Sequence, residues 1–205
     1  MNTFCAILNS AVIALLLSQL ISFLYNLPNA PLSFPQKKEQ GSTFRIIFLS
    51  VALLAAITYC ERFTFEVMLY KMSAAIFLLV IAVTDWEQYI IFDIVLFPFA
   101  VIGLCFGIWF EVPLLERLLA ALVGGTAFFA LMLATKNGIG GGDVKLVATL
   151  GLWLGADRLF STVLIASILG GVVALVLVLL GIKSRTDVFA YGPYFCIAAA
   201  FHFFD

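Results

Sequence analysis

Charged residues are scarce in this 205-residue chain. They make up 11% of it, against roughly 25% in an ordinary soluble domain, while hydrophobic residues make up 64%. A water-soluble fold of this length has no core large enough to hide so much apolar surface, whereas a lipid bilayer allows the outer face to be apolar. The net charge is only −1, so nothing in the composition points to a nucleic-acid partner or to an acidic ligand.

Histidine and paired cysteines are also nearly missing. The single histidine, His202, lies among phenylalanines near the C-terminus, and we interpret it as an interfacial residue rather than a catalytic one. The four cysteines, at positions 5, 60, 105 and 196, lie within or beside apolar runs, and no two have CxxC spacing. We therefore expect neither a Ser/His/Asp triad nor a zinc site.

Long apolar runs dominate the chain instead. A membrane span needs roughly 20 mainly apolar residues. Eight runs are candidates, the sixth and eighth of them short: about 4–25, 43–60, 66–84, 89–110, 114–135, 144–156, 159–182 and 191–204. The proline-rich stretch 26–42 is typical of a loop. We predict an all-α polytopic membrane protein with about eight transmembrane helices. Its single domain, 1–205, comprises a first helix with a proline-rich cytoplasmic loop (1–42) and a core (43–205).

Basic residues predict the orientation of the chain. If the N-terminus is outside, seven lysines and arginines fall in one set of loops (37, 38, 45, 136, 145, 183 and 185) and four in the other (62, 71, 117 and 158). The richer set is expected in the cytoplasm. This orientation places Asp85 and Asp143 on the same, cytoplasmic, side of the membrane.

These two aspartates stand out by their context. Asp85 ends a long apolar run, and Asp143 follows three glycines and precedes another apolar segment. Carboxyl groups near the depth where water gives way to lipid are candidate functional groups, because they are costly there unless paired, hydrated or protonated. Two such groups sharing one proton can hydrolyse a peptide bond, since the charged one activates water and the neutral one protonates the carbonyl oxygen. The alternatives are a solvated helix end for Asp85 and a helix N-cap for Asp143.

Other residues are candidates for supporting roles. Gly140 and Gly142 lack a Cβ, so they allow backbone or substrate to approach Asp143 closely. Lys145 would bias the charge state of Asp143, or else simply extend to the membrane surface. Glu87 and Asp93 would help to bind substrate, or else serve as a loop charge and a helix N-terminal acid. In addition, the GxxxG pattern at positions 151 and 155 suggests a close helix contact.

Three stretches resemble one known family. Residues 84–93 (TDWEQYIIFD) are similar to the first aspartate motif of the type IV prepilin peptidases, and 138–146 (GIGGGDVKL) to their second motif, of GxGD type. Residues 191–194 (YGPY) resemble the aromatic-Gly-Pro-aromatic signature before the last helix of that family. The resemblance covers roughly residues 43–205, with the motifs in the family's order and spacing.

The resemblance implies an aspartic endopeptidase of the bacterial cytoplasmic membrane, with Asp85 and Asp143 as the catalytic pair facing the cytoplasm. Its partners would be a prepilin or pseudopilin precursor and the lipid bilayer, and it would need no metal or organic cofactor. One departure is Phe92, where the family usually has proline. Another is the short, cysteine-free stretch 26–42, where bifunctional members carry two CxxC pairs, so we expect no N-methyltransferase activity.

Two other functions are compatible with parts of the pattern. Carboxylates near spans and glycine-broken helices would suit a proton- or ion-coupled transporter, although no acid lies at mid-membrane and no inverted repeat is visible. An inactive assembly subunit for a pilus or secretion system is the other alternative, and the presence of both aspartates speaks against it.

Overall fold

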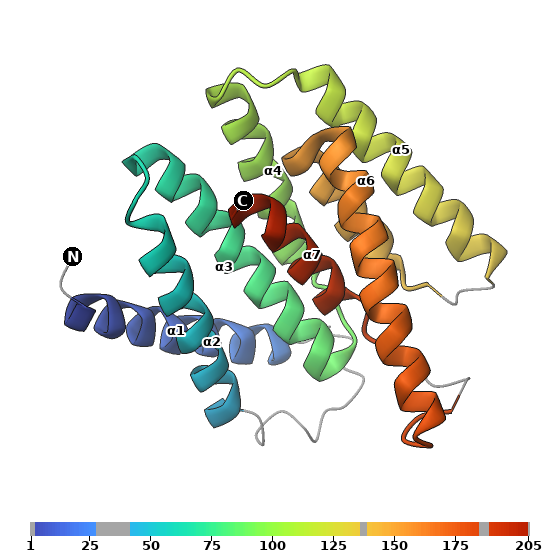
Figure 1. Ribbon diagram of the computed structural model, residues 1–205, viewed down its shortest axis with the longest axis horizontal. Coiled ribbons are helices and arrows are strands. Elements are labelled where there is room, and N and C mark those ends of the chain that lie inside the picture. Colours follow the sequence, from blue (N-terminus) through green and yellow to red (C-terminus); the bar gives the residue numbers. More distant parts are fainter. Residues whose placement is uncertain (1–2, 28–41, 136–138, 185–188, 205) are drawn as a thin grey trace. The chain divides into compact units, whose positions relative to one another are not determined.

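Helices account for the regular structure of the described part of the chain. The computed structural model describes residues 3–27, 42–135, 139–184 and 189–204. Within them are seven helices and no strand: α1 (Thr3–Tyr25), α2 (Ser42–Cys60), α3 (Phe65–Gln88), α4 (Asp93–Trp109), α5 (Leu114–Ala134), α6 (Gly141–Leu179) and α7 (Gly192–Phe204) (Figure 1). Most of the predicted proline-rich loop, 28–41, lies outside the described residues.

Length and hydropathy identify the membrane helices. Five helices, α1, α2, α3, α5 and α6, are long and apolar enough to cross a bilayer, and α4 and α7 are shorter apolar helices. The predicted all-α polytopic membrane fold is therefore confirmed. The third predicted span runs on to Gln88 as a helix, while the fourth begins only at Asp93.

The helices group into two compact units. The first comprises Met1–Ile90 together with Phe204, and the second comprises Ile91–Phe203 together with Asp205. The first therefore contains α1 to α3, and the second contains α4, α5, α6 and nearly all of α7. The proposed assignment of 1–205 to one peptidase domain stays a prediction.

The first unit is built on contacts of α2 with both α1 and α3. Ile21 of α1 and Leu49 and Leu53 of α2 are fully buried. At the far end of α3 from Asp85, the ammonium group of Lys71 lies 4.2 Å from the centroid of the Phe63 ring, so its charge is stabilised by an aromatic face.

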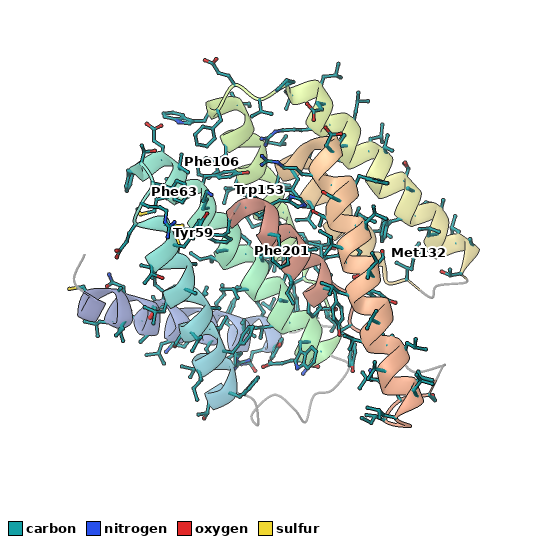
Figure 2. The ribbon with its side chains drawn as sticks, in the orientation of Figure 1. Tyr59, Phe63, Phe106, Met132, Trp153 and Phe201 are labelled. Carbon is teal, nitrogen blue, oxygen red and sulfur yellow. The ribbon has the colours of Figure 1, made fainter. Side chains whose placement is uncertain are left out.

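In the second unit, α6 packs extensively on α5 and also contacts α4. Trp153 lies at the centre: its Nε1 donates to the Phe99 carbonyl at 2.8 Å, and its ring stacks on Phe99 at 4.9 Å. Phe106 contributes a further ring, 6.1 Å from Trp153 (Figure 2). Gly103 leaves the space for the indole, since a Cβ there would lie 2.4 Å from Trp153 Nε1. The indole N–H thus has the partner that burial requires.

Helix α6 unites the two predicted spans 144–156 and 159–182. A straight helix of its 39 residues would be about 58 Å long, far more than the hydrocarbon core of roughly 30 Å. The helix is broken at Gly155, which has φ 75° and ψ −176°. Only glycine adopts that conformation without strain. Gly155 therefore makes the break. Both glycines of the predicted GxxxG pair lie against α5: Gly151 at the backbone of Ala120 and Ala121, and Gly155 at the Glu116 side chain, whose Oε1 would lie 2.8 Å from a Cβ on Gly155.

Arg117 stabilises the chain just before this break. It is only 6% exposed, and its Nη1 donates to the carbonyl oxygens of Leu152 at 3.0 Å and Gly103 at 3.3 Å. Carbonyls at the end of a helical segment lack intrahelical partners and carry partial negative charge, so a cation is favourable there.

Candidate active site

Asp85 lies in the last turn of α3, three positions before the helix ends at Gln88, and the chain turns at Tyr89. Its side chain is 6% exposed, and Thr84 and Gln88 on either side are 1% and 0% exposed. The alternative of a solvated helix end for Asp85 is therefore wrong: the carboxyl group is buried within the helix rather than displayed at its tip.

The chain leaves α3 through a residue in an uncommon conformation. Tyr89 is left-handed, with φ 58° and ψ 35°, and its N–H donates to the Asp85 carbonyl at 2.8 Å. A non-glycine residue in this region costs of order 1 kcal/mol or more and persists only where its surroundings enforce it. Phe92 then precedes α4 with φ −77°, within the range that proline would impose. The turn thus has a proline-compatible backbone at Phe92 without a proline.

Glu87 is engaged inside the first unit. Its Oε2 accepts hydrogen bonds from Arg45 Nη1 at 3.0 Å and from the Tyr25 hydroxyl at 2.9 Å. Arg45 is 2% exposed and its other nitrogens are also occupied: Nε donates to Ser18 Oγ at 3.1 Å and Nη2 to Ser22 Oγ at 3.0 Å. The predicted loop charge is therefore a helical residue, tied to α1 and α2.

Asp143 lies in the first turn of α6 and is partly buried. The N-cap is Gly140, whose carbonyl accepts from the Asp143 N–H at 3.1 Å, so the alternative of Asp143 as the N-cap is wrong. A carboxylate in the first turn of a helix is stabilised by the positive end of the helix dipole.

The glycines before Asp143 leave little spare room at two of their three positions. A Cβ on Gly140 would lie 3.2 Å from Asp143 Oδ2, and a Cβ on Gly142 would lie 3.1 Å from Ile91 Cβ. By contrast, a Cβ on Gly141 would meet nothing within 4 Å. The missing side chain of Gly140 thus leaves room for the Asp143 carboxyl group, and that of Gly142 leaves room for Ile91 at the start of α6. Gly138, the first glycine of the second motif, lies outside the described residues.

Lys145 pairs with Asp93. Its Nζ is 2.8 Å and 2.7 Å from the two carboxylate oxygens of Asp93, the first residue of α4. Both side chains are largely exposed, at 58% and 70%, so the pair contributes less than about 1 kcal/mol. The ion pair shows that Lys145 contacts Asp93, while its predicted effect on the charge state of Asp143 stays a prediction.

The second unit brings the end of the first motif against residues of the second. Ile91 lies against Gly142, and Asp93 binds Lys145, although more than 50 positions separate them along the chain. Asp85 belongs to the first unit and Asp143 to the second. Their action as a pair stays a prediction.

The contact of Arg45 with Glu87 was not predicted from the sequence, where Arg45 only indicated the orientation of the chain. The signal was present, because a charged residue in an apolar helix is a candidate for a functional or structural polar partner. His202, predicted to be interfacial, lies 2.9 Å from Ser161 with its Nε2 toward the hydroxyl. The four cysteines are free, and the described residues contain no group of three or more His, Cys, Asp or Glu side chains suited to a metal ion.

Comparison with known proteins places the two aspartates in a shared region. Residues 72–175, about half of the chain, match the Type IV leader peptidase family. A protein named "Prepilin leader peptidase/N-methyltransferase" from Pseudomonas putida is 36% identical over 129 residues, which are 59% of this chain and 44% of that protein. Proteins of the same name from Neisseria gonorrhoeae and Burkholderia pseudomallei (strain 1026b) are 33% and 31% identical. They cover 57% and 60% of this chain, and 42% of each relative.

The matched region thus spans less than half the length of these relatives. No solved structure matches the chain. The apolar helices and the bacterial relatives indicate a multi-pass protein of the bacterial inner membrane. Because the family match covers half of the sequence and includes both predicted aspartate motifs, the chain belongs to the Type IV leader peptidase family.

Proposed function

We propose that this protein is an aspartic endopeptidase that removes the leader of type IV prepilins or prepilin-like proteins at the cytoplasmic face of the membrane, with Asp85 and Asp143 as its catalytic pair. Family membership supports the reaction class. The observation that carries the assignment of residues is the meeting of the two motifs: Ile91 and Asp93, which follow Asp85 closely in the chain, contact Gly142 and Lys145, which flank Asp143.

The chemistry follows from two unlike carboxyl environments. Asp143 lies at a helix N-terminus, where the dipole favours a carboxylate, and Asp85 is buried in the last turn of a helix. In a pair of this kind the charged member removes a proton from water, and the protonated member donates to the scissile carbonyl oxygen. The apparent pKa values of the reaction belong to the pair rather than to either residue.

The substrate would have a basic leader followed by an apolar helix. That helix would lie in the bilayer against the helices of the peptidase, while the junction unwinds at the two aspartates. The excess of basic residues in one set of loops supports a cytoplasmic site. We further propose that cleavage occurs without methyl transfer, because the sequence has no CxxC pair and its four cysteines lie on four different helices.

The test is co-expression with a prepilin in a strain that lacks its own peptidase. Asp85→Asn and Asp143→Asn preserve side-chain volume, and each is expected to reduce cleavage by roughly 10²–10⁴-fold. Glu66→Gln in α3 and Asp157→Asn in α6 are matched controls, since both acids are exposed and lie in the same helices. Normal processing by either aspartate variant would rule out the two-aspartate mechanism. The mass of the mature product gives the cut site and reveals any added methyl group.

A further inference from the structure

A buried polar cluster joins the three helices of the first unit beside Asp85. It consists of Ser18, Ser22 and Tyr25 of α1, Arg45 of α2 and Glu87 of α3. Arg45 is 2% exposed and uses all three of its nitrogens, and Tyr25 is 2% exposed. In addition, the guanidinium carbon lies 5.9 Å from the centroid of the Tyr25 ring. We call this set the Arg45 cluster.

The Arg45 cluster holds the one turn of α3 that matters for the proposed reaction. Glu87 is two positions after Asp85 and two before Tyr89, and the Tyr89 N–H bonds back to the Asp85 carbonyl. The Arg45 guanidinium, at 3.0 Å, and the Tyr25 hydroxyl, at 2.9 Å, both donate to the same Glu87 oxygen. Such bonds are stronger and more directional than neutral ones, and in a buried site they resist rearrangement. The left-handed residue Tyr89 requires surroundings of this kind to persist.

Protein stability alone does not explain why these positions are polar. A buried ion pair is weak evidence for stability, since a well-packed apolar set of similar volume often does as well. What the pair provides is a fixed geometry between helices, because an arginine fork with three occupied nitrogens permits few alternative arrangements. Tyr25 and Arg45 both precede residue 72, where the family match begins, so they are outside the region shared with the family.

We propose that Arg45, together with Tyr25, is a positioning residue for Asp85: by holding Glu87 it fixes the last turn of α3, and with it the direction of the Asp85 side chain. This inference rests on the proposed function. Neither residue touches the reacting atoms; each acts through Glu87. Helices α1 and α2 therefore contribute to catalysis and do more than anchor the chain in the membrane.

The predicted signature is a loss of kcat with little change in KM. Arg45→Gln is expected to lower kcat by roughly 10–100-fold, the effect of losing a hydrogen bond between charged groups if it is expressed in the transition state. Tyr25→Phe removes one hydroxyl and should lower kcat by about 3–10-fold. Arg45→Lys keeps the charge but not the fork, and should recover part of the loss. Arg62→Gln, an exposed arginine of the same unit, is the matched control.

A second readout does not depend on cleavage. Hydrogen exchange of the full-length protein in nanodiscs should show faster exchange at the Tyr89 amide in Arg45→Gln and Tyr25→Phe, because its bond to Asp85 opens more often. Exchange in α5 should be unchanged. If the wild type cleaves no precursor, the proposed function fails, and the exchange result alone decides whether the cluster holds this turn.

The positioning role itself is decided by kcat and KM, measured for the folded variants with the precursor that the wild type cleaves. A kcat within twofold of wild type in both Arg45→Gln and Tyr25→Phe overturns the positioning role, even if exchange is faster. A rise in KM at constant kcat also overturns it, since that result indicates direct contact with substrate. Should Arg45→Gln fail to fold, Tyr25→Phe carries the test, because it deletes a single oxygen and preserves the ring.

Discussion

Replacement of Gly151 by alanine tests the packing that holds the Asp143 helix in place. Gly151 lies on α6 against the backbone of α5, and a Cβ there would lie 2.6 Å from the Ala121 nitrogen, 2.7 Å from its Cα and 2.9 Å from the Ala120 carbonyl carbon. All three are backbone atoms, so no side chain can rotate out of the way. An ordinary contact of about 3.5 Å requires the helices to separate by about 0.9 Å at this point.

This separation of α5 and α6 would lower the stability of the protein. A separation of this size forfeits a quarter to a half of the dispersion attraction between facing atoms. Between membrane helices this packing is a principal driving force, because lipid is as apolar as the side chains. Overpacking of this kind costs about 1–3 kcal/mol, and an exposed Gly→Ala change in a helix gains up to about 1 kcal/mol. Because both glycines are helical, that gain cancels between the two variants, and we expect Gly151→Ala to be about 1–3 kcal/mol less stable than Gly171→Ala, an exposed control in the same helix with nothing within 4 Å.

The assay is reversible unfolding of the two variants and the wild type in mixed micelles, by titration with a denaturing detergent. Gly171→Ala should be as stable as the wild type or slightly more so. Equal stability of the two variants would refute the close approach of α6 to α5 at Gly151, and with it the packing that places the start of α6.

Three further outcomes are expected. Gly142→Ala should reduce cleavage, assayed in membranes, by about 3–30-fold relative to Gly141→Ala. The new methyl group at position 142 would lie 3.1 Å from Ile91 Cβ, whereas a methyl group at position 141 would meet nothing within 4 Å. Lys145→Ala should lower the free energy of unfolding by less than about 1 kcal/mol, since its ion pair is exposed, and detergent unfolding at low and high salt should reveal an effect only at low salt. Gly155→Ala should destabilise the protein by about 1–2 kcal/mol, because φ is 75° there, and thermal unfolding that is unchanged from the wild type would contradict the bend.

Much of the fold could be predicted because membrane insertion depends on local hydropathy. The runs at 4–25, 43–60 and 114–135 coincide closely with α1, α2 and α5. The ends of spans were less predictable: α3 continues past Asp85 to Gln88 because Tyr89, not the aspartate, takes the left-handed conformation that stops the helix. Gly155 was predicted to be a helix contact and does lie against Glu116 of α5, but the GxxxG spacing did not predict its positive φ, which makes it the break in α6.

For the candidate site, too, some features follow from the sequence and others only from the packing. The sequence by itself determined the membrane setting, the two aspartates and the family motifs around them, because apolar length and motif spacing are written in consecutive residues. Only the tertiary structure decided the partners: Lys145 with Asp93, Gly142 with Ile91, and Arg45 with Glu87. The partners in each pair are more than 40 positions apart, and a charge in a sequence does not specify which opposite charge lies beside it once helices pack. That choice belongs to the packing, because the packing of the helices sets the distance between groups that lie far apart in the chain.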